Sequence, residues 1–182
     1  MNGKIKIAVS GRSGCGNSTV SRMVADILNL QFINFTFRTL AEERGLDLKK
    51  ILELAANDDF WDKEVDTRQV KLARESSGCV LGSRLAIWML EEADLKVYLT
   101  AKAVTRAARI FKREGGSIDE IAAFTAERDR QDHSRYLHIY DIDTDNYDFA
   151  DLIIDTDNMT PVEIADIIVN KANEISARSV IL

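Results

Sequence analysis

The chain has 182 residues, of which 46% are hydrophobic and 30% charged, a length and balance that suit one globular domain with a full core. A formal net charge of −6 argues against a broad nucleic-acid surface, which needs an excess of Lys and Arg. Apolar runs stay well short of the ~20 residues that span a bilayer, and the first residues lack the pattern of a signal peptide. We therefore expect a cytoplasmic protein with neither nucleic-acid nor membrane partners.

Short apolar strands alternate with amphipathic helices along the whole chain. The pattern predicts strands at residues 4–9, 31–34, 78–82, 94–99 and 151–155. It predicts helices at residues 17–28, 36–45, 47–56, 60–76, 84–91, 102–113, 117–137 and 160–175. This alternation is typical of a parallel sheet with helices on both faces. We expect a three-layer α/β fold with a five-stranded parallel sheet.

A glycine-rich segment, Gly11-Arg-Ser-Gly-Cys-Gly-Asn-Ser18, lies between the first predicted strand and the first predicted helix. It matches the P-loop pattern G-x-x-x-x-G-K-[S/T] at Gly11, Gly16 and Ser18. In such loops the backbone N–H groups and a helix N-terminus hold phosphates, and the Ser hydroxyl binds Mg²⁺. The segment predicts a site for a nucleoside triphosphate with Ser18 as metal ligand. The expected binding residues are Gly11, Arg12, Ser13, Gly14, Cys15, Gly16, Asn17, Ser18 and Thr19.

Asn17 stands where the P-loop pattern has lysine. That lysine normally bridges the β- and γ-phosphates and neutralises charge in the transition state. Asparagine donates a hydrogen bond but brings no charge, so phosphoryl transfer would need positive charge from elsewhere. We expect it from the arginine-rich segment 106–135, with Arg12 as a nearer alternative. An acidic chain with a local arginine cluster suits a small polyanion. The arginines of that segment are Arg106, Arg109, Arg113, Arg128, Arg130 and Arg135.

Two long, mostly helical and highly charged stretches interrupt the alternation, at residues 35–77 and 102–150. Excursions at the C-terminal edge of a parallel sheet are where substrate sites form. We expect the first stretch to hold a phosphoryl acceptor and the second to close over the phosphates. The predicted organisation is a single domain over residues 1–182, with core segments 1–34, 78–101 and 151–182, an acceptor-binding insert at 35–77 and a lid region at 102–150.

Arg84 directly follows the third predicted strand, so we expect it at the sheet edge beside the loop. Arg128 and Arg135 are seven residues apart on one predicted helix and share a face with Asp132. Arginine can bind phosphate bidentately. An ion-pair ladder along the helix is a purely structural use of the same residues. The pattern leaves both interpretations open.

Asp62 and Asp66 share one face of the helix predicted at 60–76, where they can accept hydrogen bonds from an exocyclic amine. Like-charged exposed pairs are also common without such a role. Arg38 follows the second predicted strand and can reach an acceptor phosphate. Arg68 and Gln69 extend the charged helix. For these last three residues a solvated helix face is the simpler interpretation.

Several segments carry a resemblance to a known family, and the most specific is Arg135-Tyr-Leu-His-Ile-Tyr-Asp-Ile-Asp143. The others are Gly11–Thr19, Phe37–Gly45, Asp66–Gln69, Ser83–Met89, Ala93–Val97, Arg109–Glu114, Glu127–Asp129 and Asp151–Asp155. On these segments, from about residue 4 to about residue 172, the chain resembles the short, archaeal-type cytidylate kinases. These belong to the nucleoside monophosphate kinase group of P-loop proteins.

The resemblance implies a P-loop kinase fold, and transfer of the γ-phosphoryl group of ATP to CMP or dCMP with Mg²⁺ by a monomeric enzyme. It implies that Arg84, Arg128 and Arg135 hold the acceptor phosphate and the transferring group as catalytic residues. Relatives of this short type also lack the P-loop lysine, which makes Asn17 compatible with catalysis. The resemblance further implies Arg38 and Arg84 for the acceptor phosphate and Asp132 near its sugar. We also expect Arg109 to bind ATP, and Asp62, Asp66 and Arg68 to bind the acceptor.

The sequence departs from the family pattern at three places, one of which is Gly115-Gly116-Ser117, a flexible hinge at the lid. The segment Ile33–Arg38 is about two residues shorter than usual before its arginine. The strand end Leu81-Gly-Ser-Arg84 lacks the usual acidic residue, so Mg²⁺ is expected through Ser18 and water. Two alternatives therefore stay open: the same fold with another acceptor (AMP, UMP or dephospho-coenzyme A), and a non-catalytic nucleotide-sensing module.

Overall fold

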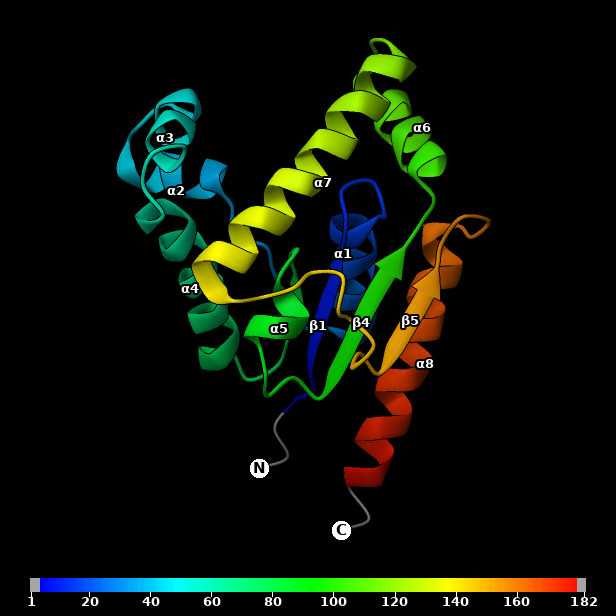
Figure 1. The fold of residues 1–182 in the computed structure, drawn as a ribbon. Coiled ribbons are helices and arrows are strands. Elements are labelled where there is room, and N and C mark those ends of the chain that lie inside the picture. Colours follow the sequence, from blue (N-terminus) through cyan, green and yellow to red (C-terminus); the bar gives the residue numbers. More distant parts are fainter. Residues whose placement is uncertain (1–3, 180–182) are drawn as a thin grey trace.

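The computed structural model describes residues 4–179, and five parallel strands form its central sheet. The strand order is β2-β3-β1-β4-β5, which confirms the predicted five-stranded parallel sheet (Figure 1). The first strand is therefore central, with β3 and β4 as its neighbours. The strands are β1 Lys6–Gly11, β2 Gln31–Ile33, β3 Cys79–Gly82, β4 Leu95–Thr100 and β5 Leu152–Asp155.

Each predicted helix is present in the described residues, and the differences lie at the ends. Helix α7 continues three residues past its predicted end. It stops at Tyr140 because Asp141 takes the left-handed backbone conformation (φ 56°) that glycine usually provides. Helix α5 is a single turn, since Leu90 leaves helical geometry (ψ 71°). The helices are α1 Asn17–Leu28, α2 Phe37–Arg44, α3 Leu48–Ala55, α4 Phe60–Glu75, α5 Ala86–Met89, α6 Ala103–Glu114, α7 Ile118–Tyr140 and α8 Pro161–Ser179.

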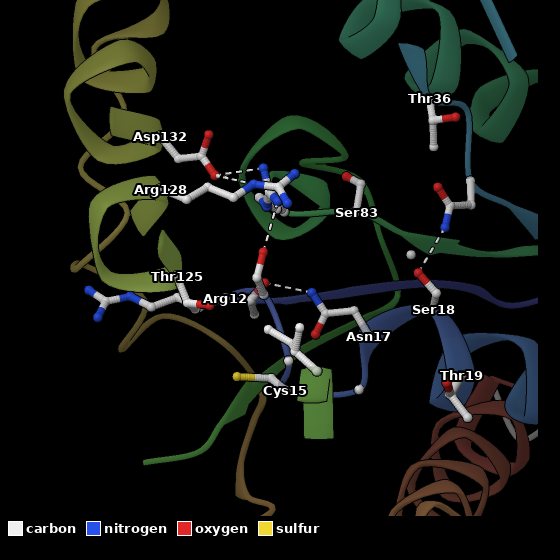
Figure 2. Close-up of a pocket in the computed structure, with 18 of the residues that line it drawn as sticks. Arg12, Cys15, Asn17, Ser18, Thr19, Thr36, Ser83, Thr125, Arg128 and Asp132 are labelled. Atoms are coloured by element: carbon white, nitrogen blue, oxygen red, sulfur yellow. Dashed lines mark hydrogen bonds and ion pairs between the residues drawn. The ribbon is translucent and has the colours of Figure 1, made fainter. Parts of the chain in front are cut away.

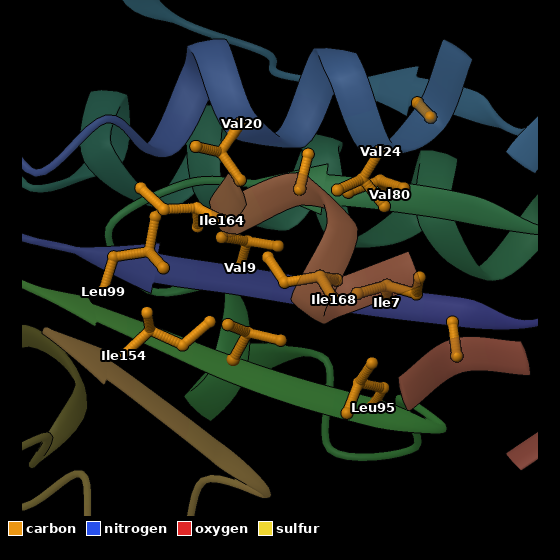
Figure 3. Packing of buried hydrophobic residues seen from close by; sticks show 14 of the residues in the cluster. Ile7, Val9, Val20, Val24, Val80, Leu95, Leu99, Ile154, Ile164 and Ile168 are labelled. Atoms are coloured by element: carbon orange, nitrogen blue, oxygen red, sulfur yellow. The ribbon is translucent and has the colours of Figure 1, made fainter. Parts of the chain in front are cut away.

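The alternation of side chains along β1 divides the core between the two faces of the sheet. Ile7 and Val9 pack with α1 and α8 on one face, where Val20 and Ile164 meet them (Figure 3). Ala8 points to the other face and joins the cluster that α4 and α5 complete. This arrangement confirms the three-layer architecture.

Two helical excursions rise from the carboxyl edge of the sheet (Figure 1). Helices α2 and α3, with the first half of α4, stand on one side, and α6 with the first half of α7 stands on the other. Since β1 and β3 both end at this edge, the loop after β1 and the residues after β3 meet between the excursions. Within residues 4–179, every helix is too short or too polar to cross a membrane.

Candidate active site

A cavity of about 1150 Å³ opens at the carboxyl edge of the sheet. Figure 2 shows Arg128 and Asp132 of α7 on one wall, with Ser18 and Asn17 of α1 across from them. The cavity brings together most residues that the sequence singled out. These lining residues are Gly11–Thr19, Asp62, Asp66, Arg84, Arg109, Arg128, Asp132 and Arg135.

The loop between β1 and α1 has the backbone shape that phosphate binding requires. Gly14 and Gly16 have φ of 84° and 103°, which side chains other than glycine rarely adopt. A Cβ on Gly14 would also lie 2.8 Å from the Arg106 Cβ. The first hydrogen bond of α1 runs from the Val20 N–H to the Gly16 carbonyl at 2.9 Å. The Cys15 N–H donates to the Arg12 carbonyl at 3.1 Å, whereas the first amides of the helix, at residues 17–19, are left for an anion at its positive end.

Asn17 closes the base of this loop. Its Nδ2 donates to the Gly11 carbonyl oxygen at 2.6 Å, and its buried Oδ1 has no hydrogen-bond partner in the described structure. A Cβ at Gly11 would lie 2.7 Å from that Oδ1, so the two residues fit only because position 11 is glycine. Asn17 thus acts within the loop and supplies no charge to a phosphate.

Oxygen atoms that suit Mg²⁺ gather beside the loop. The exposed Ser18 Oγ accepts a hydrogen bond from Asn34 Nδ2 at 3.0 Å. Ser83, just after β3, has a buried Oγ without a hydrogen-bond partner in the described structure, and it lines the same cavity. Position 82 cannot carry a carboxylate without movement, because a Cβ on Gly82 would lie 2.7 Å from Ser21 Oγ. The donor set fits a metal held by hydroxyl groups and water.

Asp132 is the centre of an arginine cluster on the opposite wall. Arg84 forms an ion pair with Asp132 at 2.6 Å and donates to Ser13 Oγ at 2.9 Å, which ties the loop to α7. Arg135 lies 2.7 Å and Arg128 3.9 Å from the same carboxylate. Burial lowers the pKa of Arg128, and the positive charge of the neighbouring Arg84 lowers it further. Three guanidinium groups around one carboxylate leave positive charge that a phosphate can neutralise.

Other arginines of the 106–135 segment do not all serve this site, which corrects the expectation of one continuous cluster. Arg106 is 5% exposed, pairs with Asp129 at 2.8 Å and donates to the Ser13 carbonyl, so it fixes α6 and α7 to the loop. Arg109 lines the cavity and donates to Thr156 Oγ1 at 2.9 Å. The other two arginines of the segment pair with acidic neighbours, Arg113 with Glu114 and Arg130 with Glu127. Arg12, the alternative source of positive charge in the loop, pairs with Asp145.

Helix α4 contributes a buried polar face, with Asp62, Asp66 and Gln69 only 3%, 9% and 2% exposed. Asp66 accepts hydrogen bonds from Tyr140 O–H and from Gln69 Nε2, each at 2.9 Å. Burial raises the pKa of Asp66 to about 6, against the opposing effect of the Tyr140 hydrogen bond. Burial also raises the pKa of Asp62, although Arg135 lies 3.4 Å away.

One residue at this wall differs from the solvated helix face that its sequence suggested, and two others match that face but differ from the acceptor role that the resemblance implies. Gln69 is buried and lines the cavity, so the solvated face expected for it is wrong. Its spacing of seven and three residues from Asp62 and Asp66 was the available signal, since this spacing places all three on one face. Arg68 pairs with Glu43 at 3.1 Å outside the cavity. Arg38 is exposed and also lies outside the cavity lining.

Comparison with known proteins bears on this site. A model of the cytidylate kinase-like family matches residues 6–158. Cytidylate kinase 2 of Borreliella burgdorferi is 46% identical over 168 residues, which cover 90% of this chain and 93% of that protein. The cytidylate kinase of Pyrococcus horikoshii is 39% identical over 160 residues, covering 87% and 83% respectively.

Solved structures establish the fold alone, because their identities to the chain are low. Shikimate kinase from Bacteroides thetaiotaomicron aligns with a TM-score of 0.61 and 16% identity over 94% of this chain and 97% of its own. Deoxyadenosine kinase from M. mycoides with bound dATP aligns with a TM-score of 0.56 and 18% identity over 93% and 100%. The predicted P-loop kinase fold is confirmed.

Proposed function

Because the chain belongs to the cytidylate kinase-like family, we propose that it transfers the γ-phosphoryl group of ATP to CMP or dCMP. The observation that carries the proposal is one cavity lined by a phosphate loop, by Arg84, Arg128 and Arg135 around Asp132, and by the acidic face of α4. Such a cavity can hold a donor triphosphate, a transferring group and an amine-bearing base together. We propose a monomer as the active form.

Positioning and charge neutralisation supply the rate in such a transfer, with little covalent chemistry from the protein. The loop amides hold the β-phosphate of ATP, and Asn17 keeps the loop closed. Ser18 would hold Mg²⁺, and Ser83 and Asn34 line the same cavity and offer further oxygen atoms. When bound, the metal supplies neutralisation of the β- and γ-phosphate oxygens.

The arginines around Asp132 take the place of the missing P-loop lysine. In the described structure Asp132 pairs with Arg84 and Arg135 and therefore holds both guanidinium groups inside the cavity. Arg128 is the least tightly paired of the three, at 3.9 Å. We assign Arg128 to the transferring phosphoryl group, and Arg84 and Arg135 to that group and the acceptor phosphate. Asp132 serves near the sugar as well as orienting these arginines.

The acceptor base lies against α4 in this proposal, where Asp62 accepts a hydrogen bond from its exocyclic amine. One oxygen of Asp62, Oδ2, is buried and has no hydrogen-bond partner in the described structure. A carboxylate there favours cytosine or adenine over uracil, since uracil lacks the amine. Arg109 and the loop residues bind ATP. Arg38 and Arg68 would need a different arrangement of α2 and α4 to reach the acceptor.

A coupled assay of ADP production tests the proposal with Mg²⁺-ATP and one acceptor at a time. CMP, dCMP, AMP, UMP and dephospho-coenzyme A form the panel. We expect turnover with CMP or dCMP to exceed turnover with every other acceptor. Turnover highest with AMP, UMP or dephospho-coenzyme A would reassign the substrate. ATP binding without turnover of any acceptor would support the nucleotide-sensing alternative.

A further inference from the structure

Gln69 presents a hydrogen-bond acceptor that nothing in the described structure satisfies. Its side chain is 2% exposed and lines the cavity. The amide nitrogen Nε2 donates to Asp66 Oδ1 at 2.9 Å, whereas the carbonyl oxygen Oε1 is buried without a partner. A buried polar atom without a partner is costly. Its presence at a cavity wall points to a ligand N–H.

The orientation of the Gln69 amide follows from its neighbours. An ionised carboxylate only accepts hydrogen bonds, so Asp66 requires the nitrogen of Gln69 to face it. The other oxygen of Asp66 accepts from the Tyr140 hydroxyl at 2.9 Å, from the C-terminal end of α7. Tyr140 therefore holds Asp66, and Asp66 turns the oxygen of Gln69 away from itself. These two hydrogen bonds connect α7 to the polar face of α4.

Apolar and aromatic side chains line the same cavity as this acceptor. Phe35, Val65 and Tyr136 line the same cavity and are 6%, 7% and 7% exposed. Asp62 precedes Gln69 by seven residues on the same helix and adds a second buried, unpartnered oxygen. Two fixed acceptors among apolar walls select a flat ligand that carries hydrogen-bond donors at its edge.

Resting on the proposed function, we propose that Gln69 Oε1, oriented by Tyr140 through Asp66, accepts one of the two N–H groups of the cytosine amine, beside the one that Asp62 accepts, and rejects uracil. Cytosine carries an N4 amino group where uracil carries the O4 oxygen, as thymine does. Uracil would place an acceptor oxygen against the Gln69 oxygen and leave both without a donor. Sites built to bond one donor reject analogues that lack it by large factors, and we expect a preference for CMP over UMP on the order of 10²-fold or more.

The test compares Gln69→Leu, Tyr140→Phe and Tyr147→Phe with the wild type. Gln69→Leu keeps a side chain of similar size and removes the acceptor, together with the Nε2 donor to Asp66. Tyr140→Phe removes only the hydroxyl that orients Asp66. Tyr147→Phe is the matched control, because Tyr147 stacks on Tyr98 outside the cavity. The readouts are kcat and KM for CMP and UMP, the Kd of each nucleotide by calorimetry, and circular dichroism to confirm folding.

We expect Gln69→Leu to lower the CMP-to-UMP ratio of kcat/KM by at least about tenfold. Tyr140→Phe should lower it several-fold through a higher KM for CMP, with kcat little changed, and Tyr147→Phe should leave it unchanged. An unchanged ratio in folded, active Gln69→Leu overturns the inference while the kinase activity stands. If the wild type turns over no nucleotide, the proposed function fails and calorimetry decides. Tighter binding of CMP than UMP that disappears in Gln69→Leu supports the inference, and equal binding by the wild type overturns it.

Discussion

Replacing Asp66 by asparagine should stabilise the protein at neutral pH, although it alters the buried polar face of α4. Asp66 is 9% exposed, and burial raises its pKa from 3.8 to about 6. The ionised carboxylate therefore destabilises the folded state. Asparagine can still accept the Tyr140 hydroxyl through its oxygen. Its nitrogen can donate to Gln69 Oε1 once the Gln69 amide turns over, which keeps this hydrogen bond and leaves Nε2 in the position that Oε1 now holds.

The size and pH range of this effect follow from the two pKa values. Between pH 3.8 and about 6 the folded protein keeps a proton that the unfolded chain has lost, so stability falls as pH rises through this window. Above the window the full penalty is present, about 3 kcal/mol at 1.36 kcal/mol per pH unit. At pH 4.5 the same two values leave about 1 kcal/mol. We expect Asp66→Asn to raise the free energy of unfolding by about 1–3 kcal/mol at pH 7.5 and by about a third as much at pH 4.5.

Urea denaturation of the wild type and Asp66→Asn at both pH values measures the difference. Asp166→Asn is the control, because Asp166 is exposed on α8 and its replacement should change stability by less than about 0.5 kcal/mol. A loss of stability in Asp66→Asn at pH 7.5 would refute the reasoning. So would an equal gain at both pH values, since the gain would then not come from the buried charge.

Two further substitutions test the charge supply and the loop, each against a control from the same part of the chain. Arg128→Ala should lower kcat by about 10²–10³-fold, whereas Arg130→Ala, whose exposed side chain pairs with Glu127, should keep kcat within about twofold. Steady-state ADP production measures both, and equal losses would remove Arg128 from its assigned role. Gly14→Ala should destabilise the protein by about 2 kcal/mol or more and raise the KM for ATP, because its φ is 84° and the new Cβ meets Arg106 at 2.8 Å. Gly116→Ala, with φ of 98° in open space, should cost only about 1 kcal/mol in thermal denaturation and leave that KM unchanged, and equal effects of the two would contradict the packing argument.

The sheet and the phosphate loop were predictable because their signals are local. Ile7 and Val9 alternate with Ala8, and the glycines at 11, 14 and 16 follow the strand directly. Helix ends were harder: Asp141 ends α7 in a conformation that sequence rules assign to glycine. The sequence around residue 141 carries no glycine that would predict where α7 ends.

The roles of individual polar residues depended on contacts between distant segments. Arg106 and Arg128 are both arginines of one predicted cluster, yet Arg106 is buried against Asp129 and the loop, and Arg128 lines the cavity. The spacing of Gln69 from Asp62 and Asp66 places the three on one helix face, but the burial of that face depends on contacts such as that of Tyr140 of α7 with Asp66. Asn17 was recognised as a missing lysine, but its bond to the Gly11 carbonyl required the loop geometry. Pairing across segments is the information that periodicity and motifs do not contain.

The central claim is that this chain moves a phosphoryl group from ATP to a cytidylate acceptor. Incubation with γ-³²P-labelled ATP, Mg²⁺ and CMP, followed by separation of the nucleotides, measures that transfer directly. We expect the amount of labelled CDP to equal the amount of ADP formed, with little label in inorganic phosphate. Label that stays in ATP, or that appears as inorganic phosphate whether or not CMP is present, would contradict it.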